Sequence, residues 1–285
     1  MVFTVWQRER LALESYALVD AGILYMATPK VACTSFKHTV AALYGIDASA
    51  LPLSLMAAKT NDLAIHDRAV VRQPSLLDLS DQERAYMLEA GEVLRFCIVR
   101  DPFRRLASAW LDRILCHSLS PIAPIFRHIE LPKYVPDWTY LSARFSEFVT
   151  CLYEHDGPNF SNHHWQRQCD LLLPDLMNYN LVARLENLSA GLTVIIDHLQ
   201  KRNLTWPGLP RFNETPVKYS SRLYTSASAR KVAAMYGADF AMYGYPTVVE
   251  PGGHSAALPP VEFVEAIQKR NQRIFHLSLK VRGLI

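Results

Sequence analysis

Two short apolar runs in the chain predict buried β-strands. The first covers residues 22–27 (GILYMA), and the second covers residues 93–99 (VLRFCIV). Neither run alternates cleanly between apolar and polar positions, and each ends in a polar loop that contains proline, as expected for strands buried on both faces of a parallel sheet. Apolar positions at helical spacing follow each run. Both segments therefore predict a strand, a loop and a helix in succession.

A third unit of the same kind begins at residues 180–185 (NLVARL), which an apolar-periodic helix follows. Repetition of this unit predicts an α/β fold, in which a single domain has a central, mostly parallel sheet flanked by helices. Ligands of such sheets bind at the carboxyl ends of the strands. We expect residues 1–250 to form the domain. Residues 251–285 are expected to form a linker and a C-terminal helix that packs on the domain or extends from it.

The composition of the chain limits the kinds of binding partner and the cellular locations that we expect. The chain has 285 residues, is 50% hydrophobic and carries a formal net charge of +3, which gives no indication of a nucleic-acid partner. It contains no run of roughly 18 apolar residues that would span a membrane. Residues 1–20 lack the apolar core and cleavage site of a signal peptide. The cysteines are scattered without a CxxC pair, so neither a metal site nor a disulfide framework is expected. We therefore expect a cytoplasmic protein without a transmembrane segment.

Residues 28–37 (TPKVACTSFK) join the end of the first strand to the start of a helix. Backbone N–H groups and the helix dipole attract anions at such a point. Lys30 adds a cation, Thr34 and Ser35 add hydroxyl donors, and the small Ala32 lets an anion approach the backbone. The Walker pattern GxxxxGK[ST] is absent, and an ordinary capped helix is the alternative. The residues predicted to bind an anion are Pro29, Lys30, Ala32, Cys33, Thr34 and Ser35.

Residues 99–110 (VRDPFRRLASAW) follow the second strand and contain an acidic residue and a proline that suit a helix start. Arg100 stands at the predicted strand tip, and Ser108 lies two turns into the helix. A guanidinium fork and a hydroxyl together can clamp a phosphate monoester. Arg104 and Arg105 are expected to be solvated or paired with acidic side chains.

Both loop segments resemble motifs of one enzyme family. Residues 28–37 look like the 5′-phosphosulfate loop of carbohydrate sulfotransferases of the type that makes the HNK-1 epitope and 4-sulfated chondroitin, grouped as sulfotransferase family 2. Residues 99–110 look like the 3′-phosphate motif of that family. Three further segments are similar to its motifs, in the same order: residues 162–168 (NHHWQRQ), 179–188 (YNLVARLENL) and 239–245 (DFAMYGY). The family often has glycine where Ala32 stands, and its Golgi members carry a membrane anchor.

The resemblance implies a sulfotransferase with a fold like that of P-loop nucleotide kinases, here a soluble bacterial member. It implies 3′-phosphoadenosine-5′-phosphosulfate (PAPS) as donor, a carbohydrate hydroxyl as acceptor, and no metal. Lys30 would then stabilise the leaving oxygen, and Arg100 and Ser108 would hold the 3′-phosphate. The alternatives are a P-loop-like nucleotide kinase, whose Walker glycine–lysine pair is missing, and a non-catalytic nucleotide-binding relative.

A histidine is the expected general base for the acceptor hydroxyl. The resemblance places a catalytic histidine between the two phosphate motifs, which favours His66. His163 and His164 are the other candidates. His164 and Trp165 could either contact the acceptor or pack in the core, and the sequence favours neither role.

Overall fold

A computed structural model describes residues 2–50, 65–120, 123–156, 162–212, 214–250 and 257–281. The chain forms two compact units. Unit 1 comprises Met1–Arg100 and Gln168–Asn213, and unit 2 comprises Asp101–Arg167 and Glu214–Ile285. The expectation of a domain over residues 1–250, followed by a linker and a C-terminal helix, stays a prediction.

Unit 1 is built on a sheet that has four strands within the described residues: β1 (Ser15–Leu18), β2 (Ile23–Met26), β3 (Leu94–Val99) and β4 (Leu181–Arg184). The strands lie in that order, with β1 antiparallel to β2, and with β2, β3 and β4 parallel to one another. The predicted α/β fold with a mostly parallel sheet is therefore confirmed. Strand β1 was not predicted, because its four residues follow a helix directly and are all buried, so no alternation marks them.

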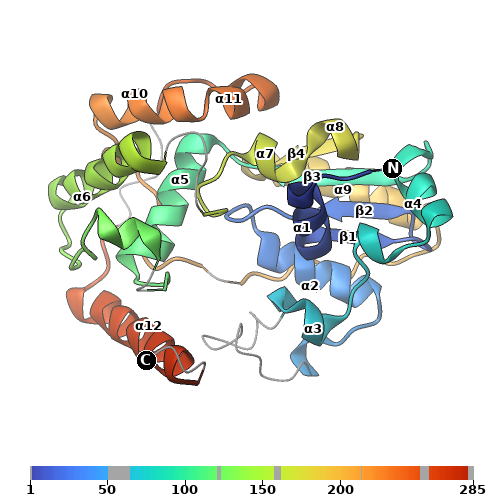
Figure 1. Ribbon diagram of the computed structural model, residues 1–285, viewed down its shortest axis with the longest axis horizontal. Helices are drawn as coiled ribbons and strands as arrows, with labels where there is room; N and C mark the ends of the chain where they lie inside the picture. The colour runs from blue at the N-terminus through green and yellow to red at the C-terminus, as the bar shows by residue number, and fades with distance from the viewer. Residues whose placement is uncertain are drawn as a thin grey trace. The chain divides into compact units, whose positions relative to one another are not determined.

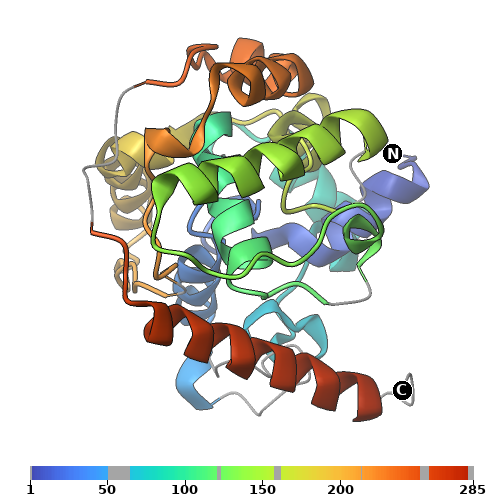
Figure 2. The ribbon, with the colours of Figure 1, turned by 90° about the vertical axis from the view of Figure 1, so that its left-hand side faces the viewer.

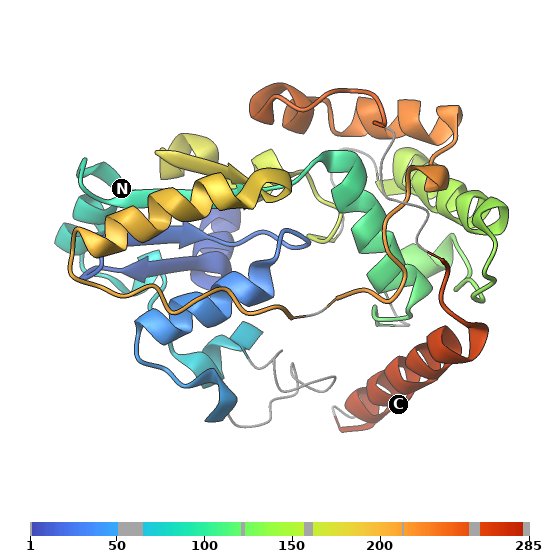
Figure 3. The ribbon, with the colours of Figure 1, turned by 180° about the vertical axis from the view of Figure 1, so that it is seen from behind.

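Helices cover both faces of this sheet. They are α1 (Val5–Glu14), α2 (Cys33–Leu43), α3 (Arg68–Val71), α4 (Asp81–Glu89), α7 (Gln168–Leu172), α8 (Pro174–Met177) and α9 (Leu188–Gln200). Figure 1 shows α1 in front of the sheet, and the reverse view in Figure 3 shows α9 in front of it. On the side of α9, Tyr25 and Phe96 of the sheet stack with ring centroids 4.8 Å apart, and Phe36 of α2 packs beside them. This aromatic contact fixes the start of α2 against the ends of β2 and β3.

Unit 2 is helical in its described residues. Its helices are α5 (Pro102–Trp110), α6 (Trp138–Cys151), α10 (Ser226–Met235), α11 (Gly237–Tyr243) and α12 (Val261–Val281). Helices α5, α6 and α10 pack against one another (Figure 2). Edge-on aromatic pairs hold their core, with Trp110 against Phe145 at 5.4 Å and Phe148 against Trp165 at 5.5 Å. Trp165 is only 1% exposed and packs in this core, which is one of the two roles that the sequence left open for it.

Helix α12 is anchored in unit 2 by buried amide side chains. Gln268 donates from Nε2 to the Leu115 carbonyl at 2.7 Å, and Asn271 donates from Nδ2 to the Cys116 carbonyl at 2.7 Å. These bonds satisfy two carbonyl groups near the end of the helical segment that continues α5. Among the described helices, none combines the length and the apolar character needed to cross a bilayer.

Candidate functional site

The loop between β2 and α2 has the backbone geometry of an anion site. Lys30 and Ala32 both have positive φ, at 71° and 64°. Ala32 is the N-cap residue of α2 and makes no side-chain hydrogen bond to the first turn. The helix start therefore has no side-chain cap from this position, unlike α5, where Asp101 accepts from the backbone N–H of Arg104. This difference argues against the alternative of an ordinary capped helix.

The structure brings Lys30 and Arg100 together at the edge of the sheet. Arg100 follows β3 directly, and its Nη1 donates to the Lys30 carbonyl at 3.1 Å. Because β2 and β3 are adjacent parallel strands, their carboxyl ends meet at the same edge. Two sequence-predicted site residues, 70 positions apart, therefore lie side by side.

Gln168 fixes the backbone of Arg100 and was not predicted as a site residue. The Arg100 N–H donates to Gln168 Oε1 at 2.9 Å, and Gln168 Nε2 donates to the Arg100 carbonyl at 2.8 Å. Gln168 is 0% exposed, so these two bonds occupy both ends of its buried amide. The only signal in the sequence was its place as the last residue of the NHHWQRQ segment.

The remaining residues of the β2–α2 loop differ in exposure. Pro29, Thr34 and Ser35 are buried, and Ala32 and Cys33 are partly buried. Thr34 Oγ1 lies 3.0 Å from His66 Nε2. The structure thus places His66, the candidate base, against the candidate phosphosulfate loop.

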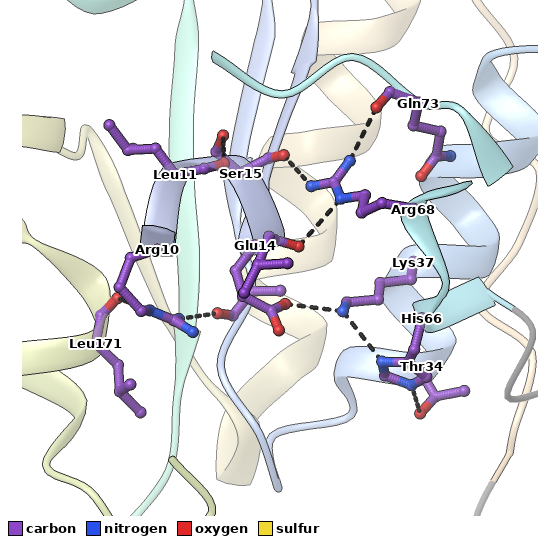
Figure 4. A network of polar contacts seen from close by, with 12 residues as sticks. Arg10, Leu11, Glu14, Ser15, Thr34, Lys37, His66, Arg68, Gln73 and Leu171 are labelled. Atoms are coloured by element: carbon purple, nitrogen blue, oxygen red, sulfur yellow. Dashed lines mark hydrogen bonds and ion pairs between the residues drawn. The ribbon is translucent and has the colours of Figure 1, made fainter. Parts of the chain in front are cut away.

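The buried Lys37 forms an ion pair with the partly buried Glu14 next to His66 (Figure 4). Lys37, on α2 and 2% exposed, has its Nζ 2.8 Å from Glu14 Oε2 at the end of α1. The same ammonium lies 3.1 Å from His66 Nδ1. Sequence reasoning missed Glu14 and gave Lys37 no role.

Charge compensation keeps both members of this pair ionised. Burial alone would raise the pKa of Glu14, but the neighbouring Lys37 and Arg10 cations outweigh it and lower that pKa to about 2. Burial alone would lower the pKa of Lys37, but the Glu14 carboxylate outweighs it and raises that pKa above its ordinary value. Arg10 is held beside the pair by a hydrogen bond from Nη2 to the Ala27 carbonyl at 3.1 Å.

The other predicted site residues belong to unit 2. Ser108 lies on α5 and is partly buried. Arg105 on the same helix is 1% exposed and donates to the carbonyls of Gln166 at 2.6 Å and His163 at 3.1 Å. Arg105 is therefore buried rather than solvated, and its two hydrogen bonds hold the segment that carries the two adjacent histidines. The other half of the expectation, pairing with an acidic side chain, stays a prediction.

His164 has a defined contact through one ring nitrogen. Its Nδ1 lies 2.7 Å from Asn162 Oδ1, which also accepts from the backbone N–H of His164 at 3.0 Å. The ring of exposed His163 lies against that of His164, with centroids 4.4 Å apart. Within the described part of the chain, no three His, Cys, Asp or Glu side chains are grouped in a way that could hold a metal ion.

A model of the sulfotransferase family matches residues 19–246, which include the β2–α2 loop, Arg100 and the His164 segment. The chain belongs to the sulfotransferase family. It is 28% identical over 250 residues to carbohydrate sulfotransferase 10 of Danio rerio, an alignment that covers 79% of this chain and 64% of the relative. It is 28% identical over 242 residues to the Homo sapiens protein of that name, covering 78% and 64%.

Carbohydrate sulfotransferase 9 of Homo sapiens is 24% identical over 239 residues, an alignment that covers 79% of this chain and 51% of that relative. The chain thus spans less than two thirds of the length of these curated relatives. No solved structure matched the chain. The prediction of a cytoplasmic location was wrong, because the relatives are carbohydrate sulfotransferases, which are Golgi membrane enzymes.

Proposed function

We propose that the chain transfers a sulfuryl group from PAPS to a carbohydrate hydroxyl. The observation that carries this proposal is the hydrogen bond from Arg100 to the Lys30 carbonyl, because it joins the two candidate donor-binding segments at one sheet edge. The names of the relatives support a carbohydrate acceptor. The positive φ of Ala32 supports the donor loop, because the related enzymes often have glycine at this position.

In the proposed reaction, the acceptor oxygen forms a bond to sulfur as the bridging bond from sulfur to the phosphate oxygen breaks. The acceptor loses its proton to a base, and 3′-phosphoadenosine-5′-phosphate leaves. Negative charge develops on the bridging oxygen in a loose, in-line transition state like that of phosphoryl transfer. Lys30 stabilises this charge, and Thr34, Ser35 and the backbone N–H groups of α2 bind the 5′ end of the donor. Arg100 and Ser108 hold the 3′-phosphate.

A histidine is the proposed base, and the hydrogen bonds support His164 over His66. Asn162 Oδ1 is a carbonyl oxygen that can only accept, so Nδ1 of His164 carries the proton. The neutral ring then has its lone pair on Nε2, which is the form that accepts a hydroxyl proton. The assignment of the base to His66 stays a prediction. It is less favourable because both nitrogens of that ring already have partners, Lys37 Nζ at 3.1 Å and Thr34 Oγ1 at 3.0 Å.

Donor binding gives the first test. Because a ligand that binds only the folded state raises its stability, 3′-phosphoadenosine-5′-phosphate should raise the melting temperature. Adenosine-5′-phosphosulfate lacks the 3′-phosphate and should raise it less. Equal shifts would contradict the roles of Arg100 and Ser108. Transfer that requires Mg²⁺ and is abolished by EDTA would instead favour the nucleotide kinase alternative.

Kinetics of two single variants then separate binding from chemistry. Lys30→Ala should lower kcat about 100- to 1,000-fold, because Lys30 meets charge that grows in the transition state. Arg100→Ala should chiefly raise the donor KM, because the charge of the 3′-phosphate does not change during transfer. A Lys30→Ala enzyme with normal kcat and only a raised donor KM would contradict this division.

His164→Asn tests the base, because its amide can still donate to Asn162 but cannot take up a proton. This variant should lower kcat on the order of 100-fold or more while leaving the donor KM near that of the wild type. His163→Asn, at the exposed neighbour, is the matched control and should retain activity. If His164→Asn retains wild-type kcat, the base lies elsewhere.

A further inference from the structure

Four polar side chains are linked by successive polar contacts from α1 to the start of α2 (Figure 4). Glu14 pairs with Lys37 at 2.8 Å, Lys37 Nζ lies 3.1 Å from His66 Nδ1, and His66 Nε2 lies 3.0 Å from Thr34 Oγ1. Thr34 is a candidate donor-binding residue, whereas the other end of the series is the ion pair of buried Lys37 with Glu14. The series therefore connects the fixed interior of unit 1 to the donor loop.

The segment that carries His66 is itself firmly attached. Ile65 is 1% exposed and packs against Ala41 of α2 and Val71 of α3. Arg68, two residues after His66, donates to the carbonyls of Leu13 and Gln73, each at 3.0 Å. Residues on either side of His66 are thus held in place, and the imidazole itself contacts Lys37 and Thr34.

Donor and acceptor chemistry fixes the tautomer of His66. The Lys37 ammonium has three N–H donors and no lone pair, so Nδ1 of His66 must accept from it. A neutral ring that accepts at Nδ1 carries its proton on Nε2. That N–H donates to Thr34 Oγ1, and the hydroxyl hydrogen of Thr34 then points away from His66.

We propose that His66 is a positioning residue: with the Glu14–Lys37 pair behind it, it orients the Thr34 hydroxyl as a donor to the 5′ phosphosulfate of PAPS. In this arrangement Nε2 has no lone pair for an acceptor proton, so His66 does not serve as the base. The inference rests on the proposed function, because it names the ligand that Thr34 binds. In this proposal, Glu14 and Lys37 affect donor binding through His66, which they hold in place.

Replacement by glutamine distinguishes positioning from base catalysis. The amide of His66→Gln offers an acceptor for Lys37 and a donor for Thr34, but it cannot take up a proton. We expect His66→Ala to weaken the binding of 3′-phosphoadenosine-5′-phosphate about tenfold by titration calorimetry, on the scale of one charge-assisted or buried hydrogen bond. His66→Gln should remain within about threefold of the wild type in both affinity and kcat, because it keeps that bond.

Thr34 variants test whether the effect passes through its hydroxyl. Thr34→Val should weaken binding as much as His66→Ala, and the double variant should be no weaker than either single variant. Thr34→Ser keeps the hydroxyl and is the matched control. Because each variant is also judged by its melting temperature without ligand, loss of folding is separated from loss of binding.

The outcomes separate this inference from the proposed function. If the wild type does not bind 3′-phosphoadenosine-5′-phosphate, the proposed function fails, and the role of His66 toward that donor fails with it. If the wild type binds and all His66 variants bind equally well, only the positioning role is overturned. A base at His66 would make His66→Gln as inactive as His66→Ala while both keep donor affinity, and that result would also overturn it.

Discussion

From the Glu14–Lys37 pair we predict how the free energy of unfolding changes with pH. Glu14 is 19% exposed, and its pKa falls from the ordinary 4.5 to about 2 because of Lys37 and Arg10. At about 1.4 kcal/mol per pKa unit, the ionised carboxylate contributes about 3 kcal/mol to the free energy of unfolding at neutral pH. Because the folded pKa is depressed, this contribution is complete above pH 4.5 and is lost as the pH falls toward 2.

The contribution can be measured with Glu14→Gln by urea unfolding, followed by circular dichroism between pH 7 and pH 3. At pH 7 the variant should be less stable than the wild type by about 3 kcal/mol, with a further cost because Lys37 stays buried without its carboxylate. Between pH 5 and pH 3 the difference should shrink by about 2 kcal/mol, because the Glu14 carboxylate of the unfolded chain takes up a proton in this range while that of the folded protein stays ionised.

Two further variants control this measurement. Glu9→Gln removes an exposed carboxylate from the same helix and should change stability by less than about 0.5 kcal/mol at either pH. Glu14→Gln combined with Lys37→Met removes both charges and should be more stable than Glu14→Gln alone. If the difference in stability between wild type and Glu14→Gln stays constant from pH 7 to pH 3, the effect comes from packing and not from the charge of Glu14.

Two other predictions concern backbone geometry. Ala32→Gly should raise the free energy of unfolding by about 1 kcal/mol, because Ala32 has a φ of 64°. Ala42→Gly, on the exposed side of α2, should lower it by about as much. Thermal unfolding that shows changes of the same sign for both variants would contradict this. Gly191→Ala should lower stability by about 1–3 kcal/mol, because a Cβ there would lie 2.5 Å from the Ala183 Cβ. Gly237→Ala, where nothing lies within 4 Å, should be neutral, and equal melting temperatures for the two variants would exclude the clash.

The sequence predicted the central strands because buried parallel strands leave short apolar runs that end in loops. Residues 22–27, 93–99 and 180–185 contain β2, β3 and β4, each within two residues of the observed bounds. The same logic placed Lys30 and Arg100 at one edge, since both follow parallel strands. The hydrogen bond between them agrees with that placement.

The buried network could not be predicted, because its members come from segments that no local pattern relates. Glu14 ends the first helix, Lys37 lies in α2, and His66 stands 29 residues after Lys37. A lysine that is 2% exposed gives no sign of its burial in the sequence, since lysine is ordinarily a surface residue. The role of Gln168 could not be predicted for the same reason, because its two hydrogen bonds to the Arg100 backbone join residues that are 68 positions apart.

Sulfuryl transfer from PAPS to a carbohydrate hydroxyl can be measured by incubating the protein, in excess EDTA, with a panel of oligosaccharides and PAPS that carries radiolabelled sulfate. We expect label in at least one oligosaccharide, together with stoichiometric release of 3′-phosphoadenosine-5′-phosphate. Label should fall by about 100-fold or more with Lys30→Ala. Tight binding of the donor product with no label in any carbohydrate, or equal labelling by Lys30→Ala, would contradict the proposed function.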